Sequence, residues 1–210
     1  MFESGGKMGG SGTIEVSDDT LDLTDAMQTF SAGAVFNASN SGAYVTGLTG
    51  ISGAKYGIFI YDGNYWVDAK AFVYDNNTGV NTYYATLAEA LATAHNNGAD
   101  DNIGMRDYAT LTANAQVDAS DTLYLGYYPT VDAGAELTVY GTLDFSSSNE
   151  FTVNGTLTFK ANSKCANLQN NSSSITVGSS GSVAGITDKN GSAFVADSVY
   201  VYDGSGWVKQ

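Results

Sequence analysis

Short runs in which apolar and polar residues alternate make up most of the chain, and Gly, Asn, Asp or Ser ends each run. Alternation with a period of two is typical of half-buried strands, and turn-forming residues between such runs mark corners. The pattern therefore predicts an all-β protein built from many short strands. The runs lie at residues 13–16, 21–23, 34–36, 44–45, 109–112, 122–125, 174–177 and 182–183.

One segment repeats itself closely. Leu137–Phe145 reads LTVYGTLDF, and Phe151–Phe159 reads FTVNGTLTF, starting fourteen residues later (137 to 151). Self-similarity at short spacing, with a Gly corner between β-branched residues, favours a solenoid of stacked coils over the alternative of an antiparallel meander or sandwich. We expect the two copies to stack directly, with Phe145 packed on Phe159. The aliphatic residues expected to point inward are Val139, Leu143, Val153 and Leu157, and the threonines expected to form ladders elsewhere are Thr138, Thr142, Thr152 and Thr156.

A second motif, Tyr-Asp-Gly-x-x-Trp-Val, occurs at residues 61–67 and again at 202–208, an offset of 141. Asp-Gly between two aromatic strands is a strong hairpin signal, because Gly accepts positive φ and Asp bonds its own turn. We interpret the motif as the closing hairpin of two related modules. The expected division is a flexible Gly-rich arm at residues 1–12, a short first β module at 13–70 and a β-solenoid module at 71–210.

One helix is predicted, at residues 86–97. Thr86 and Glu89 form a capping box, and Asn97-Gly98 supplies a left-handed end. Its apolar residues, Leu87, Ala90, Leu91 and Ala94, share one face. A short helix with one apolar stripe suits a lid over the open end of a coil stack.

The run Tyr83–Ala94 (YYATLAEALATA), followed by strands and the VNGTLTF-type repeat, resembles the helix that opens right-handed parallel β-helix modules of bacterial cell-surface proteins. Those modules belong to the pectate-lyase-like superfamily, which also includes phage tailspikes. The resemblance covers residues 82–187 and implies a capping helix at the N-terminal end of the stack. It departs at residues 102–107, which are polar, so we expect an irregular first coil there.

The chain has 210 residues and a net charge of −14, with 22 acidic against 8 basic residues. This charge works against nucleic-acid binding, which needs clusters of Lys and Arg. No apolar stretch approaches the length of a membrane span. Residues 1–12 lack the apolar core of a signal peptide. The composition is typical of a protein that works outside a cell.

Catalytic chemistry finds little support. A β-helix lyase needs a Lys or Arg base beside bound Ca²⁺, and Arg106, Lys160 and Lys164 have no Asp cluster at coil spacing. A glycosidase needs two facing carboxylates. Four acids are candidates for that role, although an acidic chain supplies such pairs by chance: Asp132, Glu136, Asp144 and Glu150.

Three other chemical features favour structural roles. His95, the sole histidine, falls at the end of the helix, where a surface cap residue is expected. Cys165, the sole cysteine, is expected to be a free thiol in the core. The densest acidic group lacks the glycine turn of a calcium loop, so no metal or other cofactor is predicted; it comprises Asp18, Asp19, Asp22 and Asp25.

The hairpin aromatics are the remaining candidates for contact with a carbohydrate or a partner. The competing interpretation is that the tryptophans close the end of each stack. The residues are Tyr61, Tyr65, Trp66, Tyr202 and Trp207.

The sequence favours a non-catalytic, extracellular or cell-surface structural protein, a stalk, adhesin segment or subunit that self-associates through its Gly-rich arm. A phage virion protein, such as a tail or head fibre, is the first alternative, because a Met1 start without a signal sequence suits it. A polysaccharide lyase or glycosidase is the second.

Overall fold

A computed structural model describes residues 7–16, 19–39, 42–53, 55–106, 108–146 and 150–210. The chain divides into two compact units, Met1–Ala69 and Lys70–Gln210. Each unit has its own hydrophobic core, because the buried residues of one cluster lie between Val16 and Trp66 and those of the other between Ala71 and Trp207.

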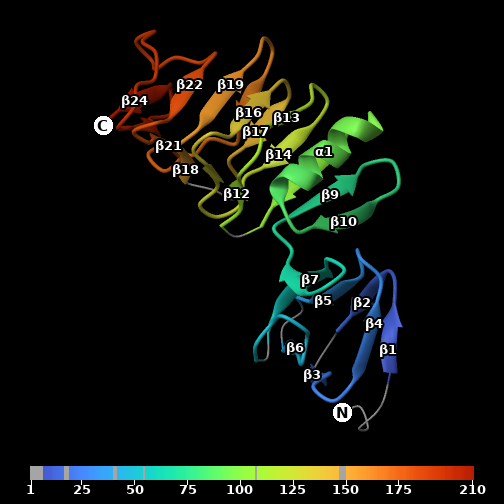
Figure 1. The fold of residues 1–210 in the computed structure, drawn as a ribbon. Coiled ribbons are helices and arrows are strands. Elements are labelled where there is room, and N and C mark those ends of the chain that lie inside the picture. Colours follow the sequence, from blue (N-terminus) through green and yellow to red (C-terminus); the bar gives the residue numbers. More distant parts are fainter. Residues whose placement is uncertain (1–6, 17–18, 40–41, 54, 107, 147–149) are drawn as a thin grey trace. The chain divides into compact units, whose positions relative to one another are not determined.

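The N-terminal unit contains two stacked coils followed by a hairpin (Figure 1). Strands β1, β2 and β3 of the first coil pair in parallel with β4, β5 and β6 of the second. The hairpin β7–β8 then adds antiparallel to β5. The strands are β1 Lys7–Gly10, β2 Thr13–Glu15, β3 Asp19–Asp22, β4 Met27–Phe30, β5 Val35–Ala38, β6 Ala43–Thr46, β7 Gly57–Tyr61 and β8 Trp66–Asp68.

The C-terminal unit is a longer stack of the same kind, opened by a hairpin and a helix and closed by a second hairpin (Figure 1). Its elements are β9 Ala71–Asp75, β10 Val80–Tyr84, α1 Leu87–Asn97, β11 Asp101–Met105, β12 Thr110–Leu111, β13 Ala115–Val117, β14 Thr122–Tyr124, β15 Thr130–Val131, β16 Glu136–Val139, β17 Thr142–Asp144, β18 Glu150–Val153, β19 Thr156–Phe159, β20 Lys164–Ala166, β21 Ser174–Val177, β22 Ser182–Ala184, β23 Ser198–Tyr202 and β24 Trp207–Lys209.

Three sheets form the sides of this stack. Sheet 1 runs β10-β9-β11-β14-β17-β20, sheet 2 runs β12-β15-β18-β21-β23-β24, and sheet 3 runs β13-β16-β19-β22. Each contains four strands paired in parallel, one from each successive coil. The prediction of an all-β parallel solenoid with one helix and closing hairpins is therefore confirmed, and the antiparallel alternative is wrong for the stack.

Columns of apolar side chains fill the interior of the coils. Ile103, Leu123 and Leu143 follow one another in sheet 1, and each is fully buried. The four aliphatic residues expected to point inward are all buried. Burying one such side chain stabilises a fold by about 1.5–3 kcal/mol, so these columns are a large source of stability for the coils. The columns in sheets 2 and 3 contain Leu111, Val131, Val153 and Val177, and Leu137, Leu157 and Val183.

The fourteen-residue repeat does not stack on itself, which corrects the expected register. Coils advance by 20 residues from Leu123 to Leu143 and by 26 from Leu157 to Val183. Leu137–Phe145 supplies β16 and β17, on sheets 3 and 1, whereas Phe151–Phe159 supplies β18 and β19, on sheets 2 and 3. Phe159 pairs with Val139, and the ring of Phe145 lies 5.8 Å from that of Trp207. The repeat therefore encodes a corner of the coil, used at two different corners.

The helix forms where the sequence predicts it. Thr86 Oγ1 accepts a hydrogen bond from the Glu89 amide (3.2 Å), Glu89 Oε2 accepts one from the Thr86 amide (3.0 Å), and Gly98 ends the helix at φ 65°. The four apolar residues of its predicted face are buried and belong to the core of the coils. The irregular coil expected at residues 102–107 is not found over β11, a regular strand between β9 and β14, and residue 107 lies outside the described residues.

The two closing hairpins are built alike. In each, Tyr pairs with Trp across the strands, as Tyr61 with Trp66 and Tyr202 with Trp207. Asp62 Oδ1 accepts the amides of residues 64 and 65, and Asp203 Oδ1 accepts those of residues 205 and 206. These bonds hold the pKa of the Asp62 carboxyl below its usual value, and the pKa of the Asp203 carboxyl is lowered mainly by a hydrogen bond from Lys189, with the Ser205 and Gly206 bonds adding to it. In each unit the closing hairpin thus pairs antiparallel with the strand two before it in the chain, β5 in one unit and β21 in the other.

The prediction of a flexible Gly-rich arm at residues 1–12 is wrong for part of that segment. Lys7–Gly10 forms β1, paired with β4, so this section is held within its own chain. Residues 1–6 lie outside the described residues. In the part of the chain that the structure describes, no helix is long and apolar enough to cross a membrane.

Candidate functional site

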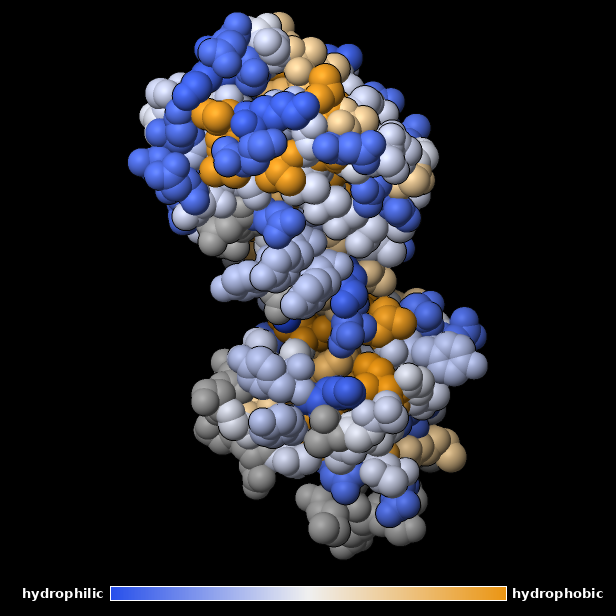
Figure 2. Space-filling model, turned by 90° about the vertical axis from the view of Figure 1, so that its left-hand side faces the viewer, coloured by the Kyte–Doolittle hydropathy of each residue, from blue (hydrophilic) through white to orange (hydrophobic). Residues whose placement is uncertain are grey.

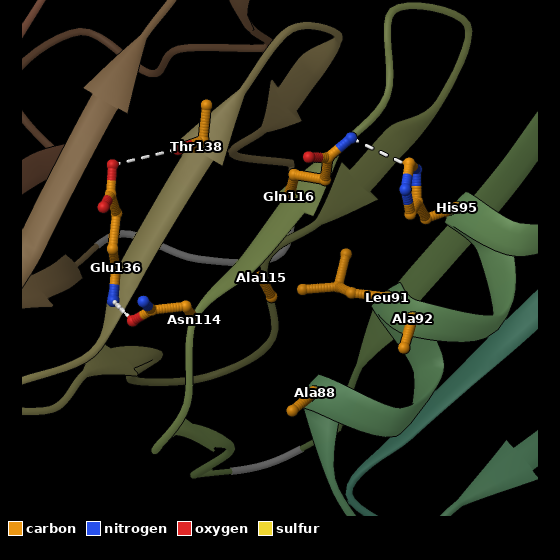
Figure 3. A pocket seen from close by; sticks show the side chains of 9 residues that line it. All are labelled: Ala88, Leu91, Ala92, His95, Asn114, Ala115, Gln116, Glu136 and Thr138. Carbon is orange, nitrogen blue, oxygen red and sulfur yellow. Dashed lines mark hydrogen bonds between the residues drawn. The ribbon is translucent and has the colours of Figure 1, made fainter.

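A groove of about 300 Å³ lies in the C-terminal unit where α1 meets the outer face of sheet 3 (Figure 3). Small residues and Leu91 form its floor, and polar side chains from β13, β16 and the end of α1 surround it. Its volume is at the lower end of the range for small-molecule sites. The lining residues are Ala88, Leu91, Ala92, His95, Asn114, Ala115, Gln116, Glu136 and Thr138.

His95 has a partner that the sequence analysis missed. Its Nδ1 lies 2.8 Å from Asp118 Oδ2 and 3.1 Å from Gln116 Nε2, and Gln116 also donates to Asp118. Because a carboxylate only accepts hydrogen bonds, the contact with Asp118 requires a hydrogen on Nδ1, and the contact with the Gln116 amide nitrogen requires Nδ1 to be unprotonated, so the two contacts belong to different tautomers. Asp118 follows β13, which packs against α1, so long-range contact and not sequence proximity brings the pair together.

Glu136 is the carboxylate among the described residues of the groove lining. Its Oε1 accepts hydrogen bonds from the hydroxyls of Thr138 (3.1 Å) and Thr158 (3.5 Å), and its amide donates to Asn114 Oδ1 (2.9 Å). The groove thus has an acceptor on one side, an imidazole on the other and an apolar floor (Figure 3). This arrangement suits the binding of a small polar molecule; glycoside hydrolysis requires a second facing carboxylate.

The four acids considered for a glycosidase do not form one site. Asp132 is at an exposed corner, Glu136 is on sheet 3 and Glu150 is on sheet 2. Asp144, on sheet 1, is buried and accepts hydrogen bonds from the Ser146 amide (2.8 Å) and Asn167 Nδ2 (2.6 Å). Glu136, Asp144 and Glu150 therefore belong to three different sheets, and Asp132 lies at the corner between β15 and β16.

A buried carboxylate pair lies instead at the start of the stack. The amide of Asp101 donates to Asp121 Oδ1 (3.0 Å), and Asn97 Nδ2 donates to Asp101 Oδ2 (2.6 Å). Within the described residues, Asp101 Oδ1 is buried without a hydrogen-bond partner. Burial raises the pKa of Asp121, and the neighbouring carboxylates of Asp101 and Asp118 raise it further. The pair is therefore less favourable when both groups are charged.

This pair predicts a pH dependence of stability. Since the pKa of Asp121 is higher in the folded than in the unfolded chain, the folded state binds more protons and stability falls as pH rises above the ordinary value of 3.8. We expect Asp121→Asn to raise the unfolding temperature at neutral pH, with the gain shrinking below about pH 4. Thermal unfolding across this pH range measures the effect. The matched control is Asp100→Asn, an exposed neighbour, and an equal gain there contradicts the prediction.

Of the hairpin aromatics, Trp66 is 1% exposed and Trp207 is 6% exposed. The Trp66 indole lies 4.7 Å from the ring of Phe36, and its Nε1 donates to Gln28 Oε1. Both tryptophans therefore pack on the coils, as the competing interpretation has it. Tyr61 and Tyr202 are half-buried, and Tyr65 is the exposed member of the set, at 56%.

The other sequence candidates are separate from these features. Cys165 is partly buried against the core, and desolvation raises the pKa of its thiol to about 12, which disfavours the thiolate form that reacts. Asp22 accepts hydrogen bonds from Thr24, and Asp18 lies outside the described residues. Among the described His, Cys, Asp and Glu residues, no group of three or more is placed to hold a metal ion.

The chain matches no protein-family model, no curated protein and no solved structure.

Proposed function

We propose that this chain is a non-catalytic structural β-solenoid protein that works outside the cell, as a stalk or subunit of a self-associating surface assembly. The observation that carries the proposal is the continuity of the stack. Three parallel sheets surround an interior filled with aliphatic and aromatic side chains, and backbone hydrogen bonds join every coil to the next. Such a stack forms an extended, protease-resistant element, as in the cell-surface β-helix modules that the sequence resembles.

The surface fits this role. On the face drawn in Figure 2, hydrophilic and weakly polar residues surround scattered apolar ones. The net charge of −14 keeps such a surface soluble and self-repelling along the sides of the stack. Association between copies is therefore favoured at the two ends of the stack, where the outermost strands leave backbone groups and interior side chains uncovered.

The first coil of the N-terminal unit supplies such an end. Strands β1, β2 and β3 are each the outermost strand of their sheet. Met8, Ile14 and Leu21 belong to this coil and are only partly buried. In the C-terminal unit α1 packs over the equivalent coil. An outermost strand next to half-covered apolar residues is a template for a strand from a second copy.

The test uses the full chain and two matched lysine substitutions. We expect oligomers or filaments by light scattering and electron microscopy, because the first-coil edges of two copies pair. Thr13→Lys places a charge on exposed β2 and should shift the chain towards monomer, whereas Val80→Lys, on the exposed outermost strand β10, should not. A wild-type chain that stays monomeric at all concentrations contradicts the proposal, as does release of reducing ends from polysaccharides.

A further inference from the structure

Two exposed tyrosines, one coil apart, adopt a backbone conformation that aromatic residues rarely have. Tyr108 and Tyr128 have φ values of 55° and 51°. The other described non-glycine residues with positive φ are Asn or Asp, which tolerate this region. Bulky residues there are strained, and such strain persists where the surrounding structure holds it, often at ligand sites. The same strained conformation therefore occurs at equivalent positions of two successive coils.

The two rings lie against each other at the surface. Their centroids are 5.5 Å apart and their planes differ by 15°. Tyr108 is 68% exposed and Tyr128 is 55% exposed. The Tyr108 amide donates to the carbonyl of Tyr127, whose side chain is also exposed. The backbone strain therefore does not bury these rings; it holds an aromatic surface outward.

One column of threonine hydroxyls runs across sheet 2, and each tyrosine lies two residues before a member of this column. Thr110 pairs with Thr130, which pairs with Thr152, which pairs with Thr176, so sheet 2 has one threonine in register from each coil. Each precedes a buried aliphatic residue, so alternation places the threonines on the outer face. Neighbouring strands lie about 4.8 Å apart, and the hydroxyls therefore form a regular row of donors and acceptors.

We propose that Tyr108, Tyr128 and this threonine column form a binding site for a neutral polysaccharide. A sugar ring has an apolar face of C–H groups that packs on an aromatic ring, and hydroxyls at its rim that exchange hydrogen bonds with threonines. The column crosses four coils, so the site fits a linear chain and not a single sugar. The net charge of −14 selects against anionic glycans.

Affinity electrophoresis of the full chain tests this site, with xyloglucan, galactomannan and mixed-linkage glucan as neutral probes and polygalacturonate as the anionic comparison. We expect at least one neutral polymer to retard the chain and polygalacturonate to leave it unaffected. Tyr108→Asn and Tyr128→Asn remove the ring but suit the backbone. Each should weaken binding by about tenfold or more while the unfolding temperature stays equal or rises.

Two control variants distinguish binding at this site from non-specific binding of the polysaccharide to exposed aromatic residues. Tyr108→Phe keeps the ring and should keep binding, and Tyr65→Ala removes a similarly exposed ring of the N-terminal unit and should leave binding unchanged. Lack of retardation by all three neutral polymers overturns the proposal. So does equal loss with Tyr65→Ala, or a lower unfolding temperature in both Asn variants. The site is independent of self-association, because a monomeric chain that binds these polymers leaves it standing.

Discussion

Gly155→Ala is expected to destabilise the C-terminal unit by about 3 kcal/mol, although it adds only one methyl group. A Cβ at Gly155 would lie 2.2 Å from the carbonyl oxygen of Ala135 and 2.3 Å from that of Asp132. Both oxygens belong to the backbone of the preceding coil, and the Thr156 amide donates to the Ala135 oxygen (2.9 Å). The added methyl must therefore separate two coils, which breaks hydrogen bonds that join them.

The matched control is Gly134→Ala, in the corner immediately below. Gly134 has φ 84° and no atom within 4 Å of an added Cβ, so Ala there meets only the cost of the left-handed conformation, about 1 kcal/mol. Denaturant unfolding in a Trp66→Phe background measures both, because Trp207 is then the sole tryptophan and reports on the C-terminal unit. Equal losses in the two variants would contradict the close approach of the coils.

Features encoded by neighbouring residues could be predicted from the sequence. The ends of α1 follow from Thr86, Glu89 and Gly98, because capping is completed within a few residues. The closing hairpins follow from the Asp-Gly turns and the paired aromatic strands for the same reason. Alternating burial along the strands follows from their period of two, which predicts an all-β protein of many short strands.

The register of the coils could not be predicted from the repeat. Val139-x-Gly141 and Val153-x-Gly155 resemble each other because each crosses a corner closely above the preceding coil. A three-sided coil has several corners, so a corner motif recurs before a full circuit is complete. The spacing of one full coil is present only in the matching dipeptides Thr122-Leu123 and Thr142-Leu143, which are too short to stand out against the longer repeat.

The site chemistry was missed for a related reason. His95 meets Asp118, and Asp101 meets Asp121, only because α1 and successive coils place them together. The strain at Tyr108 and Tyr128 has no signal in residue type, since tyrosine normally indicates an ordinary strand. The sequence suggested the hairpin aromatic residues as contacts for a carbohydrate or a partner. Trp66 is buried in the structure and is therefore not available for such a contact.

The other large effect is expected at the closing hairpin, where Trp207→Ala should destabilise the C-terminal unit by about 3–5 kcal/mol. The indole is 6% exposed, and its ring lies 5.8 Å from Phe145, 5.9 Å from Tyr202 and 6.3 Å from Phe194. Truncation leaves a cavity among these rings at the end of the stack, where few neighbours are available to fill it.

Hydrogen exchange with mass spectrometry resolves where the loss occurs. Because the two units have separate cores, Trp207→Ala should reduce protection in β21 and β23 while β5 and β7 keep theirs, and Trp66→Ala should do the reverse. Val208→Ala, the half-buried next residue of the same strand, should cost less than about 1 kcal/mol. A uniform loss across both units would show that the hairpins do not close two independent stacks.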